Sequence, residues 1–346
     1  MSPTVVEGPY LRDILDQPRA LAETHRRLEV PPGLEAVRER LAGGAFTRVV
    51  LTGMGGSFHG LWPLHLRLLE GGRASSMVET SELLHYQWAL LGRETLLVIV
   101  SQSGRSAEVV RLLEEARGGA AVIAVTNTVA SPLATMADAT VLTHAGEEAT
   151  VSCKTWVSAQ MALRWLAAVL GEEDREALRS ALAAAAGAVG RYLADWRRHV
   201  EDLARELSDV RSVFVVGRGP SLAAAGTGGL ILKESTHRPA EGMSSASFRH
   251  GPMEMLGPAV FVLVYAGPER TRALNERLVA DVRAAGGRAG LVAGDAERPA
   301  LRLPLSEPLG SILELLPVEM MTLALAALDG REAGRFAIAG KVTATE

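Results

Sequence analysis

The sequence predicts an α/β fold made of two tandem copies of one unit, each a doubly wound parallel sheet flanked by helices. A short apolar run that ends in a glycine turn and a serine occurs at 49–57 (VVLTGMGGS) and returns 164 residues later at 213–221 (VFVVGRGPS). The apolar runs at 96–100 (LLVIV) and 260–264 (VFVLV) are also 164 residues apart. A looser pair, 122–127 (VIAVTN) and 289–294 (AGLVAG), is offset by 167. Three pairs in the same order indicate a duplicated unit.

Helical patterns alternate with these apolar runs. The run at 49–57 is followed by 61–71 (LWPLHLRLLEG), and the run at 96–100 is followed by 106–119 (SAEVVRLLEEARGG). In the second copy, the corresponding helices are expected at 221–234 (SLAAAGTGGLILKE) and 271–287 (TRALNERLVADVRAAGG). Continuous apolar strands that alternate with helices are typical of parallel sheets covered on both faces. Right-handed crossovers then bring the carboxyl ends of the strands, with their glycine loops, to one edge, where ligands bind in such folds.

The remaining segments complete the predicted domain organisation. Helices are expected at 10–30, with Pro18 near the start of the second, over the Ala-rich stretch 172–208, and as one apolar helix or a pair at 309–329. We therefore expect an N-terminal helical segment (1–30), a first domain with the phosphate site (31–171), a helical linker (172–208), a second domain (209–330) and a polar tail (331–346). Trp156 and Trp165 lie on an apolar helical stretch and are expected in the core.

Composition excludes several classes of protein. The chain has 346 residues, of which 48% are hydrophobic and 22% charged, so it is neither disordered nor collagen-like. A net charge of −4 does not indicate a nucleic-acid or membrane-surface partner. The one cysteine, Cys153, forms no disulfide framework within the chain. Because we find no signal peptide and no run of about 18 uninterrupted apolar residues, we expect a cytoplasmic protein without a membrane span.

A cluster of hydroxyl groups predicts an anion site in the first copy. Ser101, Gln102, Ser103, Gly104, Arg105 and Ser106 stand in a row between the strand LLVIV and a helix. Unpaired amides and a positive dipole at a helix N-terminus favour an anion, and serine hydroxyls donate to phosphate oxygens. A helix cap alone needs only one hydroxyl.

The first glycine turn adds Ser57 to the same edge. A dinucleotide site is disfavoured there, although Glu79 lies about 25 residues on, and no GxxxxGK[ST] phosphate loop occurs. The second copy has Tyr265-Ala266-Gly267 in place of the serines, so we expect one phosphate site per chain.

Two residues of the second copy are candidates for proton transfer. Glu234 falls near the end of an apolar helix, and His250 follows in a loop closed by Gly251 and Pro252. A polar loop is expected to join them. A carboxylate and a histidine form a usual proton-shuttling pair, and burial would raise the pKa of such a glutamate. The residues alone do not exclude the alternative that Glu234 lies on a solvated helix end and that His250 is an ordinary surface histidine, neither with a catalytic role.

These motifs together resemble the sugar isomerase (SIS) domain family. VVLTGMGGS, VSQSGRSAE and LKES…FRHGP carry the resemblance, which extends from LRDILDQPRAL to the tail KVTATE. Within the family the chain looks most like the isomerase domain of glucosamine-6-phosphate synthases and the stand-alone deaminases of that type. The family implies a flavodoxin-like doubly wound fold in each copy. It also implies a phosphosugar substrate, a homodimer with a shared active site, and no metal or cofactor.

The resemblance assigns roles to residues at matching positions. The phosphate is expected to bind Ser57, Ser101, Gln102, Ser103 and Ser106. The sugar is expected to bind Gly55 and the stretch from Glu147 to Lys154, in which Ser152 and Lys154 match the family and Cys153 replaces a threonine. Glu234 matches the base that moves a proton between C1 and C2, and His250 the ring-opening histidine from the neighbouring subunit. Lys341 matches the tail lysine that covers the site, although a lysine near a chain end is otherwise expected to be mobile.

The chain also departs from the synthase pattern. Thr227 and Ile231 stand where the synthases have a glutamate and a lysine, which leaves the substrate's identity open. We find no glutaminase domain with its N-terminal cysteine, so glutamine-driven amination is not expected. The expected reaction converts glucosamine 6-phosphate to fructose 6-phosphate and ammonia. The alternatives are a fructosamine 6-phosphate deglycase, another sugar-phosphate isomerase, and a non-catalytic sugar-phosphate sensor.

Two further expectations concern reactive side chains. His59, His65, His85, His144 and His237 show no spacing typical of metal ligands, so we expect them to be structural and expect no metal site. If Cys153 lines the site, thiol reagents would inhibit the protein.

Overall fold

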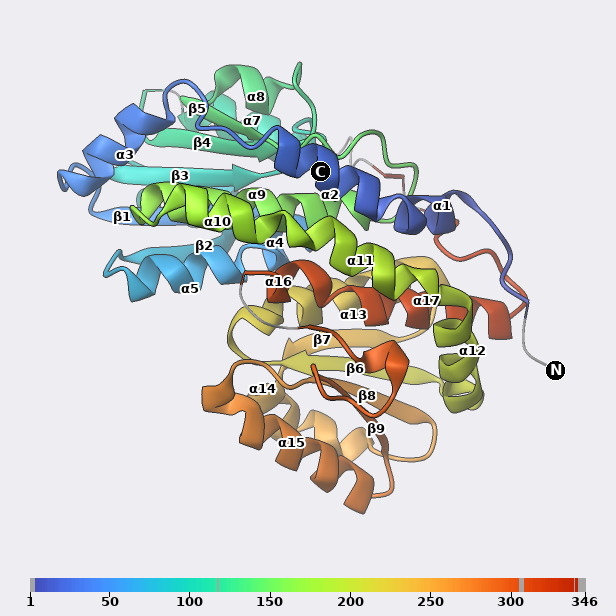
Figure 1. Cartoon of the computed structure of the whole chain (residues 1–346). Coiled ribbons are helices and arrows are strands. Elements are labelled where there is room, and N and C mark those ends of the chain that lie inside the picture. Colours follow the sequence, from blue (N-terminus) through green and yellow to red (C-terminus); the bar gives the residue numbers. More distant parts are fainter. Residues whose placement is uncertain (1–3, 117, 305–307, 339, 342–346) are drawn as a thin grey trace. The chain divides into compact units, whose positions relative to one another are not determined.

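The computed structural model describes residues 4–116, 118–304, 308–338, 340 and 341, which form two compact units (Figure 1). The five-stranded unit comprises Arg19–Glu147, Lys154–Ala184 and Ala339–Glu346. The four-stranded unit comprises Met1–Pro18, Glu148–Cys153 and Ala185–Ile338. Each unit is built around its own parallel sheet.

In the five-stranded unit, the sheet has the order β2-β1-β3-β4-β5, and all neighbouring strands are parallel. The strands are β1 (Arg48–Gly53), β2 (Ser75–Glu79), β3 (Thr95–Val100), β4 (Ala121–Thr126) and β5 (Ala139–Leu142). Every residue of β3 and β4 is buried, as expected for strands covered on both faces. The helices are α2 (Gln17–Arg26, whose first two residues belong to the four-stranded unit), α3 (Leu34–Ala42), α4 (Gly55–His59), α5 (Trp62–Glu70), α6 (Thr80–His85), α7 (Ala107–Ala116), α8 (Pro132–Met136), α9 (Lys154–Leu170) and α10 (Arg175–Leu182).

Helices cover both faces of this sheet. On one face α3 and α5 pack with α9, whose Trp156 and Trp165 are each only 3% exposed, as expected of core residues. On the other face α6, α7 and α8 close a core around Ile99 and Leu112. Because all the strands are parallel, the loops after them leave the sheet at the same carboxyl edge; the arrowheads of β3 and β4 point the same way in Figure 1.

In the four-stranded unit, the sheet has the order β7-β6-β8-β9 and is again parallel. The strands are β6 (Ser212–Gly217), β7 (Ala240–Ser244), β8 (Val260–Tyr265) and β9 (Arg288–Val292). The helices are α1 (Pro9–Leu15), α11 (Ala184–Ala194), α12 (Trp196–Leu207), α13 (Leu222–Thr236), α14 (Ser245–Arg249), α15 (Glu269–Ala284), α16 (Gly310–Leu313) and α17 (Leu316–Leu328). On one face α13 contacts β6, β7 and α17, and α17 packs on α12, while α14 and α15 cover the other face.

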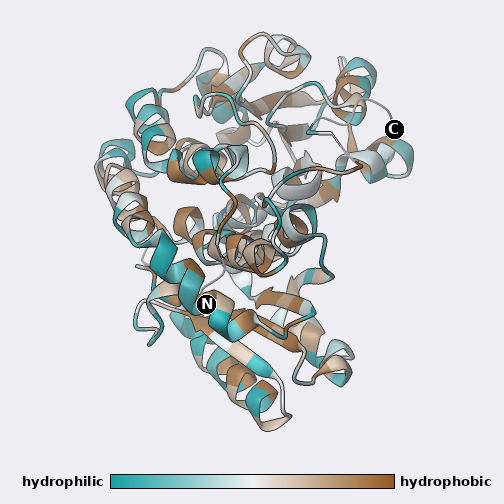
Figure 2. Ribbon diagram, turned by 90° about the vertical axis from the view of Figure 1, so that its right-hand side faces the viewer, coloured by the Kyte–Doolittle hydropathy of each residue, from teal (hydrophilic) through white to brown (hydrophobic). Residues whose placement is uncertain are grey.

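The two sheets repeat the same strand order, because β2-β1-β3-β4 corresponds to β7-β6-β8-β9. The predicted fold class is therefore confirmed. The hydropathy pattern agrees with it, since the inner strands of both sheets are largely hydrophobic and hydrophilic residues gather on the outer helix faces (Figure 2).

One sequence expectation about the four-stranded unit is wrong. The segment between Glu234 and His250 was expected to be a polar loop, but it contains the edge strand β7 and the short helix α14. Strand β7 leaves only Ala240 buried, so its sequence, AEGMS, shows no continuous apolar run. A strand of this kind takes its structure from pairing with β6 rather than from its own hydrophobicity.

The apolar stretch near the C-terminus belongs to the core. Within the described residues, Gly310–Leu328 is the one helical stretch long and apolar enough to cross a membrane, and 94% of its most apolar window is buried inside the protein. The stretch contains α16 and α17, which is the pair of helices that the sequence allowed at 309–329. Burial of this degree is typical of a core helix.

Candidate active site

The serine-rich loop of the five-stranded unit follows β3 directly. Ser101 is 8% exposed, and its Oγ accepts a hydrogen bond from the Gly104 amide at 3.1 Å. The Oγ of Ser103 accepts from the Arg105 amide at 3.2 Å. Because both hydroxyl oxygens act as acceptors within the loop, their O–H hydrogens can still be donated to an anion.

The loop leads into the ten-residue helix α7. The Ser106 carbonyl accepts the Val110 amide at 3.1 Å, so Ser106 stands at the start of the helix. Amides of a first helical turn have no partner inside the helix and carry the positive end of its dipole. Ser101, Gln102, Ser103 and Ser106 thus share one strand-to-helix turn, as expected for an anion site.

Gly104 is required by the geometry of this turn. Its φ angle is +60°, a conformation that favours glycine. A Cβ atom at this position would lie 2.4 Å from the Oγ of Ser131, which is the buried cap of α8. The glycine therefore lets the serine loop approach the start of α8.

The glycine turn after β1 lies beside the serine loop. Gly53, the last residue of β1, pairs with Val100, the last residue of β3, so both loops leave the sheet next to each other. Gly55 begins α4, and Ser57 is half-buried within that helix. This is the switch point of the sheet, where β1 is connected to β2 on one side and pairs with β3 on the other.

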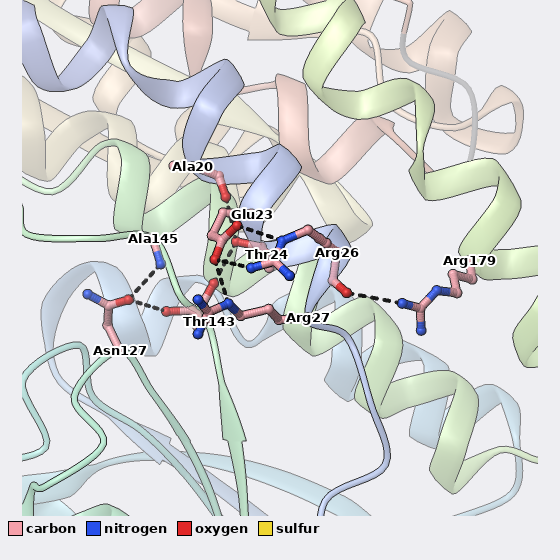
Figure 3. Close-up of polar contacts among 9 residues, drawn as sticks. All are labelled: Ala20, Glu23, Thr24, Arg26, Arg27, Asn127, Thr143, Ala145 and Arg179. Carbon is pink, nitrogen blue, oxygen red and sulfur yellow. Dashed lines mark hydrogen bonds and ion pairs between the residues drawn. The ribbon is translucent and has the colours of Figure 1, made fainter.

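Asn127, directly after β4, connects two loops of this edge. The backbone N–H of Asn127 donates to the Gln102 carbonyl at 3.1 Å, and this hydrogen bond supports the serine loop. Its Oδ1 accepts from the Thr143 hydroxyl at 2.9 Å and from the Ala145 amide at 2.8 Å (Figure 3). Thr24 of α2 fastens the same loop, because its hydroxyl donates to the Thr143 carbonyl at 2.5 Å. Our sequence reasoning missed Asn127, although a polar residue directly after an apolar strand is a usable signal.

The stretch expected to line the sugar is divided between the two units. Glu148, Ser152 and Cys153 belong to the four-stranded unit, whereas Lys154 begins α9 of the five-stranded unit. Glu148 is buried, and its Oε1 accepts the Cys153 amide at 2.9 Å. The Ala149 amide donates to Oδ2 of the buried Asp13 at 2.8 Å. Two buried carboxylates thus fix the backbone of this segment, in which Ser152 is half-buried.

Glu234 lies in the last turn of α13, as expected, and is half-buried. The helix ends at His237, which adopts a left-handed conformation with φ +56°. The Thr236 hydroxyl donates to the Leu232 carbonyl at 2.6 Å. Since α13 is followed by β7, Glu234 stands on the side of the sheet where β7 begins, opposite to its carboxyl edge.

His250 follows the carboxyl end of β7 through α14. It ends that helix, its amide donates to the Ser247 carbonyl at 3.0 Å, and its side chain is exposed in the single chain. The Ser244 hydroxyl caps the other end of α14 by accepting the Ser247 amide at 3.0 Å.

The departures from the synthase pattern are buried inside α13. Thr227 and Ile231 are both 0% exposed. Lys341 is half-buried and belongs to the five-stranded unit. Across the described part of the chain, no three His, Cys, Asp or Glu side chains cluster closely enough to hold a metal ion.

The histidines expected to be structural include one with a clear partner. The Nδ1 atom of His65 lies 3.1 Å from the Ser75 hydroxyl, and burial lowers the pKa of this histidine. A half-buried neutral imidazole that bonds a neighbouring strand fits that expectation.

A family model described as the SIS domain matches residues 47–170 and 206–304. The chain is also 28% identical over 345 residues to the glutamine–fructose-6-phosphate aminotransferase (isomerizing) of Pyrococcus horikoshii, across 94% of this chain and 56% of that protein. It spans about half the length of the curated relatives it matches.

Solved structures show the same fold. The C-terminal domain of glucosamine-fructose-6-phosphate aminotransferase from Francisella tularensis superposes with a TM-score of 0.84 at 20% identity, covering 95% of this chain and 98% of that domain. Glucosamine-6-phosphate deaminase from Thermotoga maritima superposes with a TM-score of 0.79 at 15% identity, covering 98% of this chain and all of that one (100%).

Proposed function

The chain belongs to the SIS domain family, and from this premise we propose that it is a phosphosugar aldose–ketose isomerase that releases ammonia from glucosamine 6-phosphate. The observation that carries the proposal is the serine loop at the switch point of the five-stranded sheet, with Ser101 and Ser103 both able to donate to a phosphate. The Thermotoga relative of the same fold, named a glucosamine-6-phosphate deaminase, favours this substrate.

The phosphate would be bound by Ser57, Ser101, Gln102, Ser103 and Ser106. Binding at the phosphate end supplies energy that orients the reacting end of the sugar. Gly55, Ser152 and Lys154 would contact the sugar, and the tail residue Lys341 would close over it.

Proton transfer is assigned to Glu234. After His250 assists ring opening, Glu234 takes the proton from C2 of the open-chain aldehyde while O1 gains a proton, and an enolamine forms. The same proton is returned to C1 while the amino group gives up one N–H proton, which balances the proton gained by O1, and the imine of fructose 6-phosphate results. One water molecule hydrolyses this imine to fructose 6-phosphate and ammonia. A carboxylate that both accepts and returns the proton fits such a 1,2-shift.

The test is an assay of ammonia and fructose 6-phosphate with glucosamine 6-phosphate as substrate. We expect both products in equal amounts. A fructosamine 6-phosphate and an aldose phosphate without an amino group are assayed in parallel. Turnover of the first alone would identify a deglycase, and turnover of the second alone would identify a plain isomerase. If the protein binds the sugar phosphate but turns over none of these compounds, the proposed enzymatic activity is wrong and the protein is a sugar-phosphate sensor.

We further propose a homodimer in which His250 acts on the substrate of the neighbouring subunit. Glu234 precedes the amino end of β7, whereas His250 follows its carboxyl end. This placement at opposite ends of one strand supports the proposal that the two residues of one chain serve different active sites. Each of the variants Glu234→Ala and His250→Ala should be inactive alone. Mixed dimers formed after subunit exchange should regain about one functional site of two. Absence of recovery, with exchange demonstrated by tagged subunits, would exclude the shared site.

The location in the cell stays a prediction, namely the cytoplasm.

A further inference from the structure

A carboxyl group lies fully buried in the apolar helix α17 of the four-stranded unit. Glu319 is 0% exposed, and both of its oxygens accept hydrogen bonds from Nε2 of Gln17, at 2.8 and 2.7 Å. Gln17 is also 0% exposed, and its Oε1 has no hydrogen-bond partner. The pair joins residues 302 positions apart in the sequence.

Glu319 holds its proton at neutral pH. Burial raises its pKa to about 8, an effect that the Gln17 amide opposes and the charge of Glu148 reinforces. A half-turn of the Gln17 amide would bring Oε1 to the position from which Nε2 now donates, where it could accept the acid's O–H. In that orientation Oε1, which now has no hydrogen-bond partner, would accept the proton of the buried acid.

The ionisable groups that interact with Glu319 include one carboxylate and three phenols. They are Tyr10 of α1, Glu148 of the segment 148–153, Tyr192 of α11 and Tyr265 of β8. The pKa of each of these three tyrosines is well above its ordinary value, chiefly because of burial and then because of nearby acidic groups that include Glu319. An ionised Glu319 would be a buried charge beside the carboxylate of Glu148.

Contacts connect this buried acid to the proposed reacting groups. The Thr322 hydroxyl, one turn further along α17, donates to the Glu319 carbonyl at 2.6 Å and lies 3.4 Å from the Tyr10 hydroxyl. Tyr10 in turn neighbours the Ser235 hydroxyl. Ser235 directly follows Glu234, and its carbonyl accepts the amide of Gly334, which packs against Tyr10.

We propose that Glu319 is a positioning residue. Together with Gln17 it holds α17 in place against α13, which carries Glu234, and next to the segment Glu148–Cys153, and it does so only while it carries its proton. The inference rests on the proposed function, because that function gives Glu234 and the segment 148–153 their roles. Glu319 itself does not touch the substrate. Its ionisation would act by loosening the packing between α17, Tyr10 and the end of α13.

The direction of the pH effect follows from linkage. Because the folded protein holds this proton more tightly than the unfolded chain, whose glutamate pKa is 4.5, the stabilisation is complete below pH 4.5 and is lost as the pH rises to about 8. Above pH 8 the ionised group is present in the folded protein. We therefore expect thermal stability to fall between about pH 4.5 and pH 8 and to level off above that, and kcat to fall along an alkaline limb with an apparent pKa near 8.

The test compares two variants with the parent protein. Glu319→Gln keeps the shape and cannot ionise, so the alkaline limb of kcat should move up by at least about one pH unit, which is a tenfold change in proton concentration. Glu319→Leu removes the polar pair and should lower kcat at pH 7 by about tenfold or more, with KM within about threefold. Glu206→Gln is the matched control, since burial also raises the pKa of Glu206 in the same unit, and it should leave the limb in place.

The outcomes are distinguishable. A pH profile of Glu319→Gln that coincides with that of the parent, or full kcat in a folded Glu319→Leu protein, would overturn the proposal. If no phosphosugar is turned over, the proposed function fails, and the inference is judged by hydrogen exchange at pH 9. There, the amides of 148–153 and 232–236 should be at least about threefold more protected in Glu319→Gln than in the parent, and equal protection would overturn it.

Discussion

Replacing Glu234 by glutamine should lower kcat on the phosphosugar substrate by about 10³-fold while KM stays within about threefold. The amide has the shape of the carboxylate but cannot accept and return a proton. Glu234 is half-buried in the last turn of α13, where the Thr236 hydroxyl also donates to the Leu232 carbonyl, so we expect the substitution to leave the helix intact. Steady-state kinetics of the purified variant, with its thermal unfolding recorded alongside, give the measurement.

Glu241 provides the matched control for this substitution. It is an exposed carboxylate in β7 of the same unit, 3.9 Å from the amino group of Lys233. An exposed pair of this length contributes little to stability. Glu241→Gln should therefore keep kcat within about twofold of the parent. A Glu234→Gln protein as active as the Glu241→Gln protein would remove Glu234 from the proposed mechanism.

The sequence predicted the parts of the fold that depend on local hydrophobicity. Strands β1, β3 and β4 and their counterparts β6, β8 and β9 coincide with apolar runs that could be read directly. The edge strands β2 and β7 were not predicted, because each keeps only one buried residue and shows no such run. Their pairing with β1 and β6 is a property of the folded sheet.

The same division holds for the candidate site. The serine loop was predictable because strand, turn and helix start are consecutive in the sequence. Asn127 gives no local clue to its partner Ala145, 18 residues away, although its position directly after an apolar strand marks it as a candidate, and Gln17 lies 302 residues from Glu319. Glu319, one of two glutamates in the apolar stretch 309–329, gave no sign in the sequence of a partner in the N-terminal helices, and its raised pKa depends on its burial.

Gly229→Ala should destabilise the four-stranded unit far more than an ordinary helix substitution. Gly229 lies in α13, and a Cβ atom there would fall 2.3 Å from the amide nitrogen of Gly242 in β7. Backbone atoms of a paired strand cannot move aside, so α13 would have to shift away from the sheet. Alanine is intrinsically better than glycine in a helix by about 1 kcal/mol. Overpacking against backbone should outweigh this gain by about 3 kcal/mol.

Gly228→Ala isolates the cause, because it makes the same chemical change one residue earlier. A Cβ atom at Gly228 would meet only side-chain methyl groups, at 3.1 Å from Val318 and 3.2 Å from Val215. These can yield by a few tenths of an ångström, so its Tm should stay within about 3 °C of the parent, whereas Gly229→Ala should lower Tm by about 6 °C or more. Because α13 also carries Glu234, Gly229→Ala should lose activity at temperatures well below its unfolding transition. Equal Tm values for the two variants would mean that α13 does not need the close approach to β7, and that another contact sets the position of Glu234.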